Sequence, residues 1–96
     1  MCYRVIPSPD AEGNIESAIQ WYVLEDVDLA FRFIAETTTT LRRIARNPFQ
    51  FPVVNHVVRR ALLKRFPYAI YFSLRGDTVV VTAVLHQRRL TAWTTD

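Results

Sequence analysis

The pattern of apolar and polar positions predicts a strand and then a helix at the start of the chain. Residues 2–7 form a short apolar run that Pro7 ends, which is typical of a strand. Ser8 then offers a hydroxyl as a helix N-cap, and Pro9 suits the first helical position. The helix should extend to about Leu24, because apolar residues recur at spacings of three and four. They are Ala11, Ile15, Ala18, Ile19 and Tyr22.

A second helical stripe follows, for which Asp26 or Asp28 can serve as the N-cap. Its apolar members are Val27, Ala30, Phe31, Ile34, Leu41, Ile44 and Ala45. Residues 37–40 are threonines of mediocre helix propensity, but the stripe resumes in phase after them, so we expect the helix to continue to Asn47 and Pro48. The short link between the two stripes predicts an antiparallel helical hairpin. We expect its aromatic residues to be core residues or helix contacts rather than a ligand-binding box, namely Trp21, Tyr22, Phe31 and Phe33.

The second half of the chain is typical of a sheet. Residues 57–89 predict three antiparallel strands, divided at Phe66 and Pro67 and at a hairpin turn in which Gly76 supplies a positive φ. In the middle strand, residues 68, 70, 72 and 74 alternate with residues 69, 71, 73 and 75, which gives the sheet two distinct faces. Residues 47–56 contain two prolines and two phenylalanines and are predicted to be an extended loop.

The predicted order is therefore β-α-α-β-β-β. This is one α+β domain over residues 1–96, with an N-terminal helical hairpin packed on one face of a small, mainly antiparallel sheet. A chain of 96 residues that is half apolar can bury enough surface to fold as a single domain.

Cysteine and histidine usage argues against a disulfide or a metal site. Cys2 has no second cysteine to pair with, and together with His56 and His86 it makes a poor metal set. No charge-free apolar run approaches the roughly 18 residues that a membrane span needs. We expect a cytoplasmic protein that uses no cofactor and no membrane.

Charge is unevenly distributed along the chain. Residues 1–40 contain two basic and seven acidic residues, whereas residues 41–96 contain ten basic and two acidic residues. This asymmetry suggests that the second half meets nucleic acid or an acidic protein segment. The alternative is a solvated basic sheet edge that deters aggregation.

Several segments, in this order and spacing, resemble the RelE/ParE toxins of bacterial type II toxin–antitoxin pairs. They are Ala11, Ile15, Ala18 and Trp21-Tyr22; Leu41, Ile44, Pro48 and Phe51-Pro52; and Arg59-Arg60, residues 66–71 and residues 83–89. The resemblance implies a small cytoplasmic toxin held inactive in a hetero-oligomer with a co-expressed antitoxin. In such pairs a disordered segment of the antitoxin wraps the toxin and covers its basic surface.

Within this family the residues favour one of two targets. RelE-like members cut messenger RNA on the ribosome, with an arginine after the tyrosine of the middle strand and a tyrosine near the C-terminus. This chain has Ala69 and Trp93 near those positions, so two expected catalytic side chains are missing. The run from His86 to Arg89 followed by Trp93 is similar to ParE-like members, which bind and block DNA gyrase, although the proline common after the arginine pair is absent.

The resemblance and the charge pattern together nominate binding residues: Arg59, Arg60, Lys64, Arg65, His86, Arg88, Arg89 and Trp93. We expect Arg60 and Lys64 to share one face of the sheet. If the chain were instead a RelE-like ribonuclease acting on the ribosome and messenger RNA, His86, Arg88 and Arg60 would be its catalytic candidates. A third reading is an inactive member that is retained as an antitoxin-binding module.

Overall fold

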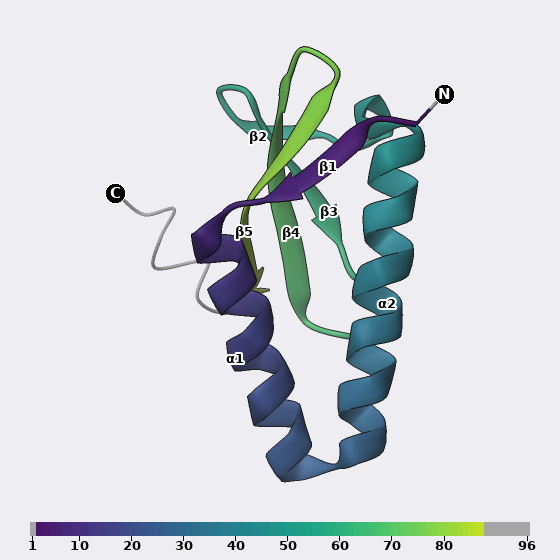
Figure 1. Ribbon diagram of the computed structural model, residues 1–96, viewed down its shortest axis with the longest axis vertical. Coiled ribbons are helices and arrows are strands. Elements are labelled where there is room, and N and C mark those ends of the chain that lie inside the picture. The colour runs from purple at the N-terminus through teal and green to yellow at the C-terminus, as the bar shows by residue number, and fades with distance from the viewer. Residues whose placement is uncertain (1, 88–96) are drawn as a thin grey trace.

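Two helices lie on one face of a five-stranded sheet (Figure 1). The computed structural model describes residues 2–87. The elements are β1 (Arg4–Pro7), α1 (Pro9–Glu25), α2 (Val27–Arg46), the 3-10 turn η1 (Pro48–Gln50), β2 (Val53–Asn55), β3 (Val58–Leu62), β4 (Tyr68–Arg75) and β5 (Thr78–His86). The strand order is β1-β5-β4-β3-β2, with β1 parallel to β5 and every other pair antiparallel. The predicted α+β class, the helical hairpin and the three long strands are confirmed.

The expected loop at residues 47–56 is wrong in two places, because it contains η1 and the short edge strand β2. The side chain of Asn47 caps η1 by accepting from the backbone N–H of Phe49 at 3.2 Å. Arg59 then fastens this segment to the sheet: its Nη1 donates to the carbonyl of Phe51 at 2.6 Å, and its guanidinium lies 5.2 Å from the centroid of the Phe49 ring. These contacts hold residues 49–51 against β3, and the chain that follows them pairs with β3 as β2.

The helix boundaries follow the predicted caps. Ser8 Oγ accepts from the backbone N–H of Ala11 at 3.1 Å and caps α1. Asp26 is the cap of α2, since its carboxylate accepts from the backbone N–H of Asp28 at 2.9 Å. The backbone N–H of Asp26 also donates to the carbonyl of Tyr22 at 2.7 Å, so one residue closes the first helix and opens the second.

The second helix continues through its threonines as predicted, but its core face differs from the predicted stripe. The residues of α2 that are buried are Ala30, Phe33, Thr37, Thr40 and Ile44. The hydroxyl of Thr40 donates to the carbonyl of Glu36 at 2.8 Å, so this buried polar group is satisfied within the helix. Of the predicted stripe only Ala30 and Ile44 are buried, while Phe31 is 66% exposed. The helix therefore has two apolar faces, one on the core and one outside it.

The sheet meets the helices through alternate residues of β4, as its pattern predicts. Ile70 and Phe72 are fully buried in the core beneath the helices. Opposite them β5 has one extra residue, because Tyr71 pairs with Ala83 whereas Phe72 pairs with Val81. This bulge at Thr82 lies beside the start of α1, where the hydroxyl of Ser8 donates to the carbonyl of Thr82 at 3.2 Å.

The β4–β5 turn contains Gly76 at φ 62°, which confirms the predicted hairpin. None of the helices within residues 2–87 is long and apolar enough to cross a membrane.

We expect Phe33→Ala to lower the free energy of unfolding by about 3–5 kcal/mol, because it empties a fully buried site between helix and sheet. Phe31→Ala on the same helix removes the same ring from an exposed position and should change the free energy by about 0.5 kcal/mol or less. Urea denaturation of both variants measures the difference. Equal losses of unfolding free energy in the two variants would show that Phe33 is not a core residue.

Removal of the α1 cap by Ser8→Ala should lower the free energy of unfolding by about 1 kcal/mol, which corresponds to about 4–8 °C in melting temperature. The matched control is Ser17→Ala, which changes an exposed position of the same helix. A melting temperature unchanged in Ser8→Ala would mean that the cap contributes nothing to stability.

Candidate functional site

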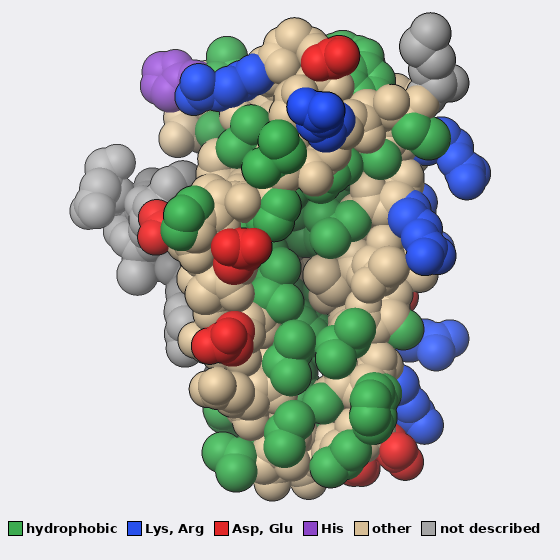
Figure 2. Space-filling view, viewed as in Figure 1, with side chains coloured by type: hydrophobic (Ala, Val, Ile, Leu, Met, Phe, Trp, Pro, Cys, Tyr) green, Lys and Arg blue, Asp and Glu red, His purple; other side chains and the backbone are tan. Residues whose placement is uncertain are grey.

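An apolar groove runs along the outer side of the helical hairpin between α1 and α2, where Figure 2 shows hydrophobic side chains gathered in a continuous band. A hollow of about 420 Å³ forms its upper part. The residues that line this hollow are Tyr3, Val5, Pro7, Ile15, Thr38, Leu41, Arg42, Ala45 and Val81. We call it the helical groove.

Beyond the groove, exposed apolar residues continue to the tip of the hairpin. They are Val23, Leu24, Val27, Phe31 and Ile34, with Leu24 the most exposed at 84%. We call this set the hairpin patch. Because α1 and α2 each bury only one face on the sheet, the patch has no partner within residues 2–87. Exposed apolar patches of this extent mark interaction surfaces in soluble proteins.

The two helices that flank the groove differ in charge. The acidic residues of α1 are Asp10, Glu12, Glu16 and Glu25, and the helix contains no basic residue. The basic residues of α2 are Arg32, Arg42, Arg43 and Arg46, against Asp28 and Glu36. Figure 2 shows acidic side chains over α1 and basic side chains along the outer edge of α2. A partner in the groove therefore meets opposite charges on its two sides.

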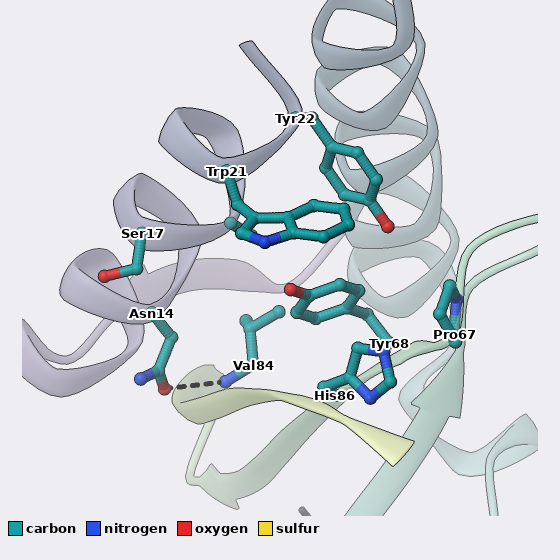
Figure 3. A pocket seen from close by; sticks show the side chains of 9 residues that line it. Asn14, Ser17, Trp21, Tyr22, Pro67, Tyr68, Val84 and His86 are labelled. Carbon is teal, nitrogen blue, oxygen red and sulfur yellow. Dashed lines mark hydrogen bonds between the residues drawn. The ribbon is translucent and has the colours of Figure 1, made fainter. Parts of the chain in front are cut away.

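A second cavity, of about 640 Å³, lies on the other side of α1, between this helix and the ends of β4 and β5 (Figure 3). Its lining residues are Asn14, Ser17, Ala18, Trp21, Tyr22, Pro67, Tyr68, Val84 and His86. We call it the aromatic pocket. The backbone N–H of Val84 donates to Asn14 Oδ1 at 3.0 Å, which ties α1 to β5 at the floor of the pocket (Figure 3).

The aromatic residues of the hairpin are divided between the core and the surface. Tyr22 and Phe33 are buried, as expected, and their ring centroids lie 5.3 Å apart. Burial raises the pKa of the Tyr22 phenol, and the neighbouring Tyr68 raises it further. Trp21 and Phe31 are not core residues, because Trp21 is 56% exposed and Phe31 belongs to the hairpin patch. Trp21 is instead a helix contact, since its ring lies 5.2 Å from that of Tyr22.

The structure does not bring the predicted basic residues into one cluster. Arg59 lies on the helix side of the sheet against Phe49 and Phe51, whereas Arg60 pairs with Tyr71 and faces the opposite side. This pair sends one side chain to each face, as predicted. The guanidinium of Arg59 has a structural role in holding residues 47–52, and a binding role for either arginine stays a prediction.

Lys64 and Arg65 lie beyond the end of β3, so strand alternation does not place Lys64 on the face of Arg60. This corrects the sequence argument. The strand ends at Leu62, Arg65 has φ 70°, and the chain turns there toward α2. The backbone N–H of Lys64 donates to Glu36 of α2 at 2.9 Å. The two residues belong to a turn beside the second helix, and their binding role stays a prediction.

On the sheet face away from the helices, Tyr71 is buried beside Arg60 and Gln87. Burial raises the pKa of the Tyr71 phenol, while interactions with Arg60 and Gln87 act in the opposite direction and are smaller. The phenol is therefore neutral at physiological pH. It does not supply the phenolate that a general base would require.

The residues that a ribonuclease would use do not converge within residues 2–87. His86 pairs with Tyr68 on the helix side of the sheet, and the two rings lie 5.2 Å apart in an edge-to-face arrangement. Arg60 faces the other side. Arg88, Arg89 and Trp93 lie outside the described residues, so the predictions for them stand untested. Among residues 2–87 no three His, Cys, Asp or Glu side chains come together as a metal site.

The helical groove and the hairpin patch were missed at the level of sequence. A signal was present in α2, which carries more apolar residues than one core face needs: Phe31 and Ile34 stand beside the buried Ala30 and Phe33. The predicted stripe combined Ala30 with Phe31 and Ile34 as one face, so the second face was not recognised.

Comparisons with known proteins agree with this architecture. The family described as "ParE toxin of type II toxin-antitoxin system, parDE" matches residues 5–91. No curated protein sequence matches the chain. A solved structure titled "Chromosomal ParDE TA system from P. aeruginosa" has the same fold with a TM-score of 0.78; it is 15% identical, and the match covers 88% of this chain and 96% of that one. Because the family match spans nearly the whole chain, the protein belongs to the ParE toxin family of type II toxin–antitoxin systems.

Proposed function

We propose that this toxin inhibits DNA gyrase by binding it, without making or breaking a bond itself, and that a cognate antitoxin neutralises the toxin in the cytoplasm. The family match supports the toxin role. The separation of His86 from Arg60 supports binding over catalysis, and it is the observation that carries the proposal. Cleavage of RNA needs a proton-transfer group and cationic groups at the same phosphate. Here the sheet lies between these two side chains.

The antitoxin is proposed to place an amphipathic helix in the helical groove and over the hairpin patch. An apolar groove is the usual receptor for such a helix. The opposite charges of the two walls set the orientation of the helix, because its acidic side should face the arginines of α2 and its basic side the carboxylates of α1.

Phe31→Ser should weaken binding of the antitoxin roughly 10- to 100-fold, because it removes one large apolar contact from the hairpin patch. Isothermal titration with the purified cognate antitoxin measures the change. Val57→Ser is the matched control, since Val57 is 71% exposed but lies at the β2–β3 turn, away from the groove. Equal effects of the two substitutions would contradict the proposed groove site.

Two assays on the purified toxin separate binding from catalysis. We expect the toxin to block supercoiling by purified gyrase in amounts comparable to the gyrase present, because each toxin molecule acts by occupancy. We expect no cleavage of messenger RNA on translating ribosomes. Cleavage that disappears in His86→Ala but persists in the exposed control His56→Ala would instead establish a RelE-like ribonuclease. If the toxin neither blocks supercoiling nor cleaves messenger RNA, it is an inactive antitoxin-binding module.

A further inference from the structure

The aromatic pocket presents ring faces on opposite sides of one cavity. Figure 3 shows the indole of Trp21 across the cavity from the ring of Tyr68, with Tyr22 beside them. The Trp21 and Tyr22 rings are 5.2 Å apart and nearly perpendicular, so they contact each other edge to face. Trp21 is 56% exposed, and its face is therefore accessible to a partner.

The surroundings of the pocket favour a cation. Ring faces carry negative electrostatic potential, with tryptophan the strongest. The helix wall of the pocket belongs to α1, which has four acidic residues and no basic one. The last turn of α1 contains no basic residue and ends in Glu25. None of the residues that line the pocket within the described chain is a lysine or an arginine.

A flat cation can stack on the ring faces of this pocket. A guanidinium is planar and stacks on aromatic faces, whereas an ammonium is a compact and strongly hydrated charge. The α1 wall adds the amide of Asn14, whose Oδ1 accepts from the backbone N–H of Val84, whereas the Ser17 hydroxyl points away from the rings in Figure 3. An amide oxygen has two lone pairs, so Asn14 Oδ1 can also accept from an N–H of a guanidinium. The cavity of about 640 Å³ is large enough for an arginine side chain.

The pocket and the helical groove share α1 as a common wall. Ile15 faces the groove, and Asn14, Ser17 and Trp21 face the pocket. An extended segment that leaves the groove must pass around the exposed half of α1, a path of about 16 Å on a helix about 10 Å wide, which takes about five residues. Glu12 and Glu16 on the exposed surface of α1 attract a basic segment along that route.

We propose that the aromatic pocket is a second docking point for the antitoxin and that it holds the side chain of an antitoxin arginine. This inference rests on neutralisation by an antitoxin and adds a site to the groove proposed above. The antitoxin contacts both sides of α1, with an apolar helix on one side and a stacked guanidinium on the other.

The pocket can be tested first with a small probe. Trp93→Phe leaves Trp21 as the single tryptophan of the chain, so its fluorescence reports on the pocket. Titration with N-acetyl-arginine amide should change this fluorescence saturably at millimolar concentration, and the matching lysine, phenylalanine and proline derivatives should bind more weakly. Absence of a saturable change with arginine, or tighter binding of phenylalanine or proline, would overturn the assignment of an arginine site.

The antitoxin is tested by a double-mutant cycle on the complete complex. Trp21→Leu should weaken antitoxin binding at least tenfold, and Trp21→Phe should weaken it less, because phenylalanine retains an aromatic face. One arginine of the antitoxin, when changed to alanine, should have no further effect in the Trp21→Leu background. Effects that simply add for every antitoxin arginine would overturn the proposal.

The outcomes distinguish this site from the proposed groove. A loss of affinity in Phe31→Ser with none in Trp21→Leu would keep the groove and reject the pocket. A loss in Trp21→Leu alone would keep the pocket and reject the groove. Weakened inhibition of gyrase by Trp21→Leu with unchanged antitoxin affinity would assign the pocket to the target and overturn the antitoxin as its occupant.

Discussion

One aromatic cluster joins both helices to the sheet, and the positions of the surface sites depend on it. Tyr22 of α1 and Phe33 of α2 pack against Phe66 of the β3–β4 turn and Tyr68 of β4, with ring centroids 5.2–6.2 Å apart. Rings of this size at these separations fix the helices relative to the strands. The helical groove and the aromatic pocket are the spaces left on either side of α1 once this packing is complete.

Local signals in the sequence were sufficient for most of the fold. The caps at Ser8 and Asp26, the alternation in β4 and the turn at Gly76 each depend on residues close together in the chain, and each was predictable. The core face of α2 was not, because it includes Thr37 and Thr40 and excludes Phe31. Which side of a wide apolar stripe is buried depends on the partner surface, and that surface is assembled from strands far away in sequence.

The candidate site was less predictable than the fold for a related reason. Charge pattern drew attention to the arginines of the second half, but Arg59 is engaged with the loop before β2, and Arg60 lies on the other face of the sheet. The exposed apolar residues of the hairpin carry no chemical motif and are recognised as a surface only after the core has been located. Such a surface is what the core leaves uncovered.

The pairing of β1 with β5 has a consequence for synthesis of the toxin. Arg4 lies beside Thr78, and the Ser8 hydroxyl donates to the carbonyl of Thr82, so β1 and the residue that caps α1 have partners more than 70 residues later. Contacts so distant in sequence slow folding, because a long loop must close before they form. A nascent chain on the ribosome therefore lacks one edge of its sheet and the support of α1 until β5 has emerged. The edge strand β1 and the start of α1 therefore reach their final positions only after β5 is available.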